Sequence, residues 1–304
     1  MLTCAAMTTN LVDQKHWDGG YAEGEYSPLP ADDFVRTWVN AHVPKGTGDC
    51  LEVGCFPGRY LGMFGDLGYR LHGVDLTPRV EEIAGWLSAA GYQAGSFHRQ
   101  DFLTCAFDRR FDVVSSFGFI EHFTNWHEVL ARHADLVAPG GHLVIEAPNM
   151  AGLVQRVLRR LFEPEDLKRH CTAAMNLDAW SAVVRRLGFD VVYAEPLGNF
   201  DFWRMQPGEP GMEFELSVLV QVLTPILRAR TETRSPVSSG YIGLIARRSA
   251  EGPPPGDPAR TKDLTAIAMR AAMRDRDIDA ATQATIDRVR AWVKYMHDRW
   301  TPKA

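Results

Sequence analysis

The sequence predicts an α/β protein with a Rossmann-like, seven-stranded, mostly parallel sheet and helices on both faces. Two observations support this class: short β-rich runs alternate with helical segments from Cys50 onward, and a glycine-containing turn follows the first of these runs. Such alternation is typical of a parallel sheet covered by helices. The seven expected strands are 50–54, 70–75, 96–99, 111–116, 142–147, 190–194 and 241–246.

Helical segments are expected between these strands. Gly91 and Gly188 follow two of them at the position where a left-handed residue commonly ends a helix. Another helix is expected to start near Gly58, directly after the turn. The three longest candidates between strands are 79–90, 126–136 and 177–187.

The chain is expected to divide around one main domain and a linker. Three consecutive prolines and two glycines mark the linker. Beyond it, apolar residues recur at spacings of three and four, so they share one helix face, which either packs on the chain's own domain or forms a homodimer. These residues are Ile286, Val289, Val293, Met296 and Trp300. The expected parts are an N-terminal cap (1–44), the main domain (45–248) with insertions 150–176 and 200–240, the linker (249–259) and a helical tail (260–304).

Composition narrows the class of protein. The chain has 304 residues, of which 45% are apolar and 23% charged, with a formal net charge of -5. A negative net charge argues against a nucleic-acid-binding protein, which would need a clustered basic surface to contact phosphates. The cysteines are scattered without a close pair, which favours a reducing cytoplasm. We expect neither a signal peptide nor a membrane span, because no apolar run approaches the roughly 20 residues that a span needs.

A nucleotide-like ligand is expected at the turn after the first strand. Gly54 and Gly58 allow the backbone to approach such a ligand closely. Asp75 ends the second strand, where its carboxylate can accept hydrogen bonds from ribose hydroxyls, although it could instead cap the following helix. A dinucleotide site requires the pattern Gly-x-Gly-x-x-Gly. In this sequence Cys55, Phe56 and a proline separate Gly54 from Gly58, so the second glycine of that pattern is absent. A pyrophosphate would therefore fit poorly.

Residues 45–247 resemble the class I S-adenosylmethionine-dependent methyltransferases, in particular the ubiquinone-methyltransferase-like branch that acts on small molecules. The first motif of that family reads acidic-x-Gly-x-Gly-x-Gly. Glu52, Gly54 and Gly58 match it, and Phe56 departs from it. The resemblance implies S-adenosylmethionine as the cofactor, with Gly54 beside its methionine moiety and Glu52 ordering the loop.

The resemblance also implies further contacts with the cofactor. Asp75 would bind the ribose, Asp101 the adenine amino group, and the backbone of Phe102 would lie around the adenine. Ser116, at the end of the fourth strand, and Tyr21, in a Trp-Asp-x-x-Tyr-like segment, complete the expected set. The alternatives are that Asp101 is an ordinary loop carboxylate and that Tyr21 is a packing anchor.

Two histidines are candidate catalytic residues. His122 follows the fourth strand in segment 111–122, which resembles the family's fourth motif and its Glu-His pair, and 136–145 resembles the Pro-Gly-Gly turn and fifth strand. His170 lies in the insertion 150–176. Either imidazole could accept the proton of a hydroxyl acceptor. The alternatives are that His122 only organises the cofactor loop and that His170 is a surface residue.

The predicted activity is S-adenosylmethionine-dependent methyl transfer to a small molecule, with a hydroxyl oxygen of a sugar or other biosynthetic metabolite as the first choice. No catalytic metal is expected, because the strand ending at Ser116 lacks a carboxylate and the histidines lack a His-x-x-x-His spacing. A noncatalytic cofactor-binding partner protein, an N- or C-methyltransferase and a nicotinamide oxidoreductase are the alternatives. The apolar insertion 200–240 is expected to form a lid, extend the core or rest on a membrane surface.

Overall fold

The sheet has seven strands, as the sequence predicts. The computed structural model describes residues 10–20, 22, 24–203, 217–230 and 234–300. Its strand order is β3-β2-β1-β4-β5-β7-β6, and β7 runs antiparallel to both of its neighbours, whereas the other pairs are parallel. The strands are β1 (Asp49–Val53), β2 (Arg70–Asp75), β3 (Ala94–Arg99), β4 (Phe111–Phe117), β5 (Val137–Pro148), β6 (Phe189–Phe200) and β7 (Ser239–Arg248).

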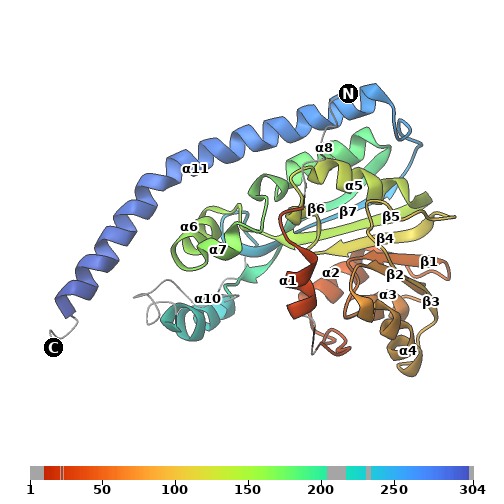
Figure 1. Ribbon diagram of the computed structural model, residues 1–304, viewed down its shortest axis with the longest axis horizontal. Helices are drawn as coiled ribbons and strands as arrows, with labels where there is room; N and C mark the ends of the chain where they lie inside the picture. Colours follow the sequence, from red (N-terminus) through yellow and green to blue (C-terminus); the bar gives the residue numbers. More distant parts are fainter. Residues whose placement is uncertain (1–9, 21, 23, 204–216, 231–233, 301–304) are drawn as a thin grey trace.

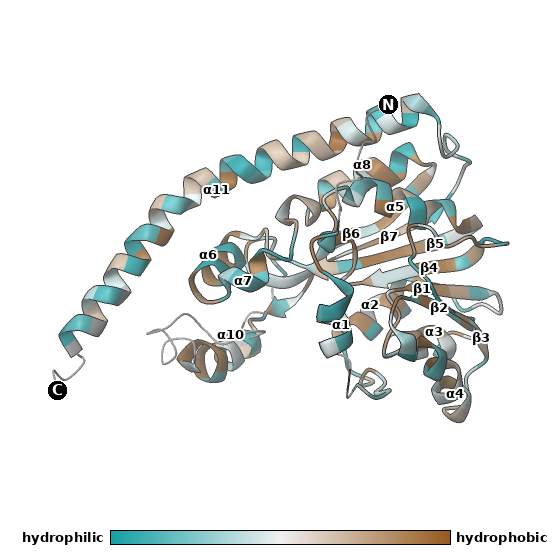
Figure 2. Cartoon of the chain, viewed as in Figure 1, coloured by the Kyte–Doolittle hydropathy of each residue, from teal (hydrophilic) through white to brown (hydrophobic). Residues whose placement is uncertain are grey.

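Helices cover both faces of this sheet (Figure 1). Trp126 of α5, Trp180 of α8 and Leu264 of α11 belong to the apolar cluster on one face, while Trp38 of α2 and Phe64 of α3 belong to that on the other. Figure 2 shows the apolar residues gathered in the central strands between these layers. The helices are α1 (Gln14–Gly20), α2 (Phe34–His42), α3 (Leu61–Asp66), α4 (Glu82–Ala89), α5 (Trp126–Asp135), α6 (Leu153–Phe162), α7 (Pro164–Leu167), α8 (Leu177–Arg186), α10 (Thr224–Arg230) and α11 (Pro258–Trp300). Short turns of helix are η1 (Pro78–Glu81), η2 (Ile120–His122), η3 (Thr172–Ala174) and η4 (Leu219–Leu223).

The expected strands are all present, and the differences lie at element ends. β5 begins earlier than expected, because Val137 already pairs with Phe111 ahead of the Pro-Gly-Gly turn. Gly58 lies in the turn at φ +84°, so α3 starts three residues after it. Gly91 and Gly188 have φ of 88° and 87°, which confirms their left-handed position after a helix.

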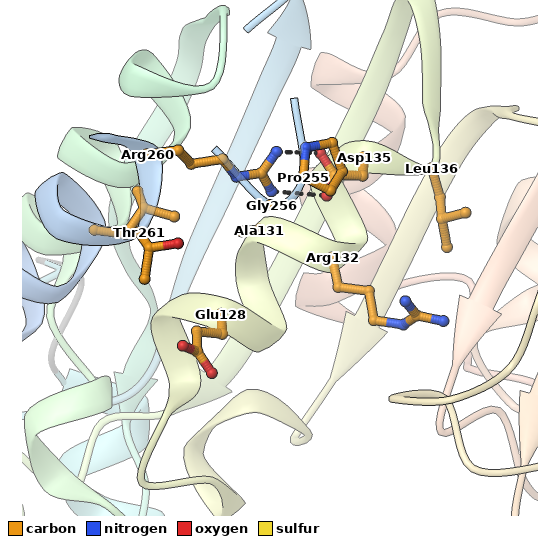
Figure 3. A pocket seen from close by; sticks show the side chains of 10 residues that line it. Glu128, Ala131, Arg132, Asp135, Leu136, Pro255, Gly256, Arg260 and Thr261 are labelled. Carbon is orange, nitrogen blue, oxygen red and sulfur yellow. Dashed lines mark hydrogen bonds and ion pairs between the residues drawn. The ribbon is translucent and has the colours of Figure 1, made fainter. Parts of the chain in front are cut away.

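The tail forms a single helix that packs on the rest of the chain. Leu264 and Ala271 are buried in the cluster on the α5 and α8 face, and Ile286 is buried farther along. At the start of α11, both terminal nitrogens of Arg260 donate to the carboxylate of Asp135 at 2.9 and 2.7 Å (Figure 3). A bidentate pair of this kind fixes the angle between two helices.

The predicted alternative in which the tail helix packs on the chain's own domain is therefore confirmed at Ile286. Ile286 is 1% exposed, and Val289 packs against the same cluster, whereas the side chains of Val293 and Trp300 lie outside the described part of the structure. α11 starts at Pro258, inside the expected linker. The domain boundary and a homodimer through this helix stay predictions.

The second insertion extends the core over part of its length. Phe202 and Leu219 are buried together with residues of α6, while Val222 and Ile226 are half exposed. Residues 204–216 of this insertion lie outside the described residues. Among the described helices, none has both the length and the apolar character required to cross a membrane.

Candidate functional site

A cavity of about 420 Å³ opens where β1, β2, β3 and β4 end. We call it the first cavity. Four residues that the sequence assigns to a cofactor line it, namely Gly54, Asp75, Asp101 and Phe102. The carboxyl edge of a parallel sheet is the usual place for a ligand in this fold class. Its other lining residues are Asn10, Gln14, Trp17, Val74, Leu76, Gln100, Leu103, Phe117, Gly118, Phe119, His122 and Phe123.

The turn after β1 requires glycine at position 54. Gly54 has φ +67°, and a Cβ placed there would lie 2.7 Å from the ring of Phe119. Its amide donates to the carbonyl of Val74 at 2.9 Å, which holds the turn against the end of β2. A side chain here would be strained and would also push into the first cavity.

Asp75 joins this turn to the end of β2. Its two carboxylate oxygens accept hydrogen bonds from the amides of Phe56 at 3.1 Å and Thr77 at 2.9 Å. Burial raises the pKa of the carboxyl group. The aromatic ring of Phe56 is buried against Trp86, which explains how a large residue replaces a glycine of the family motif: its backbone serves the turn while its ring joins the core.

The remaining cofactor candidates lie behind the wall of the first cavity or outside the described residues. Glu52 is buried, and burial raises the pKa of its carboxyl group well above the ordinary value. Gly58 packs against Ile83, and Ser116 is fully buried in β4. Tyr21 lies outside the described residues.

Helix α5 supports the loop after β3 through hydrogen bonds from Arg132. Asp101 accepts a hydrogen bond from the amide of Leu103 at 2.9 Å. Arg132 of α5, seen in Figure 3, donates to the carbonyls of Phe102 and Cys105, and its guanidinium lies 5.2 Å from the centre of the Phe102 ring. The sequence gives no local sign of this support, because Arg132 looks like an ordinary helix residue.

The N-terminal segment closes over the first cavity. Asn10 forms an isolated antiparallel bridge with Phe123, and the amide of Leu11 donates to the carbonyl of His122 at 2.8 Å. The ring of Trp17 lies 5.0 Å from that of His122 in an edge arrangement. Sequence reasoning found Trp17 through its resemblance to a family segment but missed Asn10, which belongs to no motif.

A second cavity of about 220 Å³ adjoins the first. The two share Trp17, Phe117, Gly118 and His122 as lining residues. Insertion residues form much of the remaining wall, so a molecule in the second cavity would meet one in the first at this shared boundary. The other lining residues are His16, Tyr60, Glu121, Glu146, Pro148, Met150, Asp166, Arg169, His170, Trp203 and Tyr241.

Stacked aromatic pairs stand on the wall of the second cavity. Tyr60 and Phe117 stack with ring centres 4.2 Å apart, and Trp203 and Tyr241 stack at 5.1 Å with nearly parallel planes. The guanidinium of Arg159 lies 4.2 Å from the centre of the Trp203 ring, on which it stacks. These residues come from distant parts of the chain, and the sequence analysis reached only Phe117, within segment 111–122, and Trp203, within the insertion 200–240.

The two candidate catalytic histidines lie side by side in this cavity. Their ring centres are 4.7 Å apart. Nδ1 of His122 lies 2.8 Å from the carbonyl oxygen of Arg169, and Nδ1 of His170 lies 2.8 Å from that of Asp166. Because a carbonyl oxygen can only accept, both Nδ1 atoms carry the proton, and Nε2 of each neutral ring keeps a free electron pair.

Glu121 completes this cluster. One of its oxygens lies 3.9 Å from Nε2 of His122, and the side chain is 1% exposed. Burial raises the pKa of Glu121 to about 8 and lowers the pKa of His122 to about 3, and it also lowers the pKa of His170. The fold thus brings His170, from an insertion, to the adjacent pair Glu121 and His122, and gathers one buried carboxyl group and two neutral imidazoles.

The chain is similar to proteins that transfer methyl groups. Residues 29–194, more than half of the chain, match the family model described as "Methyltransferase domain". Two curated relatives are both named ubiquinone biosynthesis O-methyltransferase. The relative from Albidiferax ferrireducens is 30% identical over 44% of this chain and 53% of its own length, and that from Thiobacillus denitrificans is 27% identical over 44% and 57%. The chain thus spans about half the length of these relatives.

A solved structure has the same fold. It is that of a Bacillus halodurans C-125 protein whose name describes it as a candidate methyltransferase. The two chains align with a TM-score of 0.51 and 16% identity, over 72% of this chain and 99% of the other. The likeness confirms the expected Rossmann-like sheet.

Proposed function

The chain belongs to the methyltransferase domain family, and on this premise we propose that it is an S-adenosylmethionine-dependent O-methyltransferase whose acceptor is a hydroxyl group on an aromatic ring. The single observation that carries the proposal is the shared boundary of the two cavities at Trp17, Phe117, Gly118 and His122. A reaction that moves one small group between two molecules needs this arrangement of neighbouring chambers.

The first cavity fits S-adenosylmethionine. Its volume lies within the range of small-molecule sites. The carboxylate of Asp75 would accept hydrogen bonds from the ribose, the loop from Asp101 to Leu103 would hold the adenine, and Gly54 would leave room for the methionine part. When bound, this cofactor supplies an electrophilic methyl group on a sulfonium.

The second cavity fits a flat acceptor. The rings of Tyr60, Phe117, Trp203 and Tyr241 line this cavity as two stacked pairs, and their edges offer an aromatic wall against which an aromatic ring can pack. The names of the curated relatives refer to O-methylation in ubiquinone biosynthesis, which agrees with an aromatic hydroxyl. A sugar hydroxyl, which the sequence prediction of a sugar or other metabolite hydroxyl includes, is the second candidate, because aromatic rings also pack against sugar rings.

The protein's own contribution is alignment and exclusion of water. The bridge between Asn10 and Phe123 holds the N-terminal segment over the boundary, and Trp17 closes it beside His122. We assign handling of the acceptor hydroxyl to His122 and His170, because both rings stand on the wall of the second cavity and both keep Nε2 available.

A substrate panel with paired variants tests this function. The protein is incubated with S-adenosylmethionine and phenols, catechols, sugars or amines, and formation of S-adenosylhomocysteine and of methylated product is followed. Tyr241→Ala should raise the KM for the acceptor and leave cofactor affinity unchanged, whereas Asp75→Ala should do the reverse. Binding of S-adenosylhomocysteine without turnover on any acceptor would favour a noncatalytic binding protein, and turnover only on amines would favour N-methylation.

A further inference from the structure

We propose that Glu121, His122 and His170 bind a divalent transition-metal ion in the second cavity. One potential ligand atom of each residue lies within 4.8 Å of the other two. Two imidazoles and one carboxylate form a recurrent metal-binding set that leaves coordination positions open. This inference departs from the sequence expectation of no metal, which rested on spacing along the chain and could not foresee that an insertion would bring His170 to the Glu-His pair.

The hydrogen bonds of the two histidines suit metal binding. In both rings Nδ1 donates to a backbone carbonyl, that of Arg169 for His122 and that of Asp166 for His170. Histidines that ligate a metal usually donate their other ring nitrogen in this way, which fixes the ring and leaves the free electron pair for the ion. The carbonyls of one short segment thus orient both imidazoles before any ion arrives.

The carboxylate supplies an independent indication. Oε2 of Glu121 is buried and makes no hydrogen bond within the part of the chain that the structure describes. Glu146 lines the same cavity, and its buried Oε1 also has no hydrogen-bond partner among the described residues. Buried carboxylate oxygens without partners are costly. A cation bound beside both groups would remove this cost.

The positively charged side chains near the cluster do not already neutralise Glu121 and Glu146. Arg169 lines the cavity and Arg159 lies nearby, but both guanidiniums pair with the carboxylate of Asp166, at 2.7 and 3.4 Å, and neither satisfies Oε2 of Glu121 or Oε1 of Glu146. The ligand atoms lie within 4.8 Å of one another and need to approach each other by up to about 1.3–1.8 Å, since ligands at 2.0–2.2 Å from an ion lie roughly 3–3.5 Å apart. Rotation of the Glu121 side chain would supply part of this shift, and the two histidine rings would supply the rest by small movements that keep each Nδ1 hydrogen-bonded to its carbonyl.

The inference rests on the proposed function in one respect: the open coordination positions would take the acceptor oxygen. A metal-bound hydroxyl loses its proton more readily, and the ion would also fix the oxygen at the boundary of the two cavities. In this arrangement His122 and His170 act on the acceptor through the ion instead of as free bases. The proton released by the acceptor hydroxyl would pass to the carboxylate of Glu146, which lines the same cavity.

Metal binding is tested without reference to activity. The purified full chain is stripped with a chelator and titrated with Co²⁺, whose visible d–d absorption reports the ligand set, and with Zn²⁺ by calorimetry. We expect one equivalent of either ion in the wild type. Glu121→Gln and His170→Ala should lower the affinity at least tenfold. His142→Gln, which alters a similarly buried histidine of β5 outside the cluster, should bind Co²⁺ as the wild type does.

Binding of S-adenosylhomocysteine serves as the check on folding, because neither Glu121 nor His170 lines the first cavity. The metal proposal is overturned if folded wild type shows no Co²⁺ band, or if Glu121→Gln and His170→Ala bind Co²⁺ as tightly as His142→Gln. Failure of the proposed function is a separate result: Co²⁺ would bind at this cluster while no acceptor is methylated.

Discussion

Replacement of Asp75 should weaken cofactor binding by removing the carboxylate at the end of β2 on the wall of the first cavity. The carboxylate already accepts one backbone hydrogen bond on each oxygen, and both oxygens keep an electron pair for a ribose hydroxyl. Hydrogen bonds to a charged group contribute about 1.5–3 kcal/mol. Asp75→Ala should therefore raise the Kd for S-adenosylhomocysteine by roughly 10- to 150-fold.

Isothermal titration calorimetry measures this change directly. Asp101→Ala is the matched control, because that carboxylate is exposed and water competes with its ligand, so its loss should cost less. Circular dichroism verifies that the turn still folds after the amides of Phe56 and Thr77 lose their acceptor. An affinity within twofold of the wild type for folded Asp75→Ala would refute the assignment of the ribose to this residue.

Three further changes have defined outcomes. Gly54→Ala should abolish measurable binding of S-adenosylhomocysteine, because the new Cβ would lie 2.7 Å from the Phe119 ring at φ +67°. Ile286→Ala should lower the free energy of unfolding in urea by about 2–5 kcal/mol, the usual cost of a large-to-small change in a core. Acid should destabilise the fold through His133, whose burial lowers its pKa from 6.5 to about 4. Between these two values the unfolded chain binds the proton and the folded chain does not, so stability is full above pH 6.5 and falls by about 3 kcal/mol as the pH drops to 4.

Each of these outcomes has its own control. Ala268→Gly on α11 alters the same helix without removing a large buried side chain, so a loss equal to that of Ile286→Ala would contradict docking through Ile286. For acid stability, His133→Gln should reduce the slope of unfolding free energy against pH by the share of one proton, while buried His122 still contributes, and an unchanged slope would show that other histidines cause the whole dependence. Gly54→Ala that binds S-adenosylhomocysteine normally would contradict the steric argument.

The sequence predicted the parts of the molecule that depend on local pattern. The strands follow from short apolar runs, and Gly54 and Asp75 follow from their positions at strand ends, so all of these were found without tertiary information. The role of Arg132 was not predicted, because it depends on the loop after β3, which packs against α5 only in the folded chain. The same holds for Tyr60 and Tyr241, which are ordinary aromatic residues in the sequence and acquire a role only when the fold stacks them beside a cavity.

The histidine pair shows where the limit lies. His122 was identified from its place after the fourth strand and His170 from its place in an insertion, and each was regarded as an alternative to the other. Their contact depends on the path of α6 and α7, which turn the insertion back toward β4. No spacing rule along the chain describes that path, and so the prediction of a single catalytic histidine could not anticipate a cluster with Glu121.

Largely different strand ends line the two cavities, and this separation bears on how related enzymes can change their acceptor. The first cavity draws its walls from the ends of β1 to β4, whereas the second draws on the ends of β4 and β5, on β7 and on both insertions. An exchange of the insertions between homologues would therefore replace a third of the residues that line the acceptor's cavity and leave the turn at Gly54 and the carboxylate of Asp75 in place. Chimeras that carry foreign insertions should keep their donor and change their acceptor, so that one cofactor-binding half of the molecule can serve different acceptors.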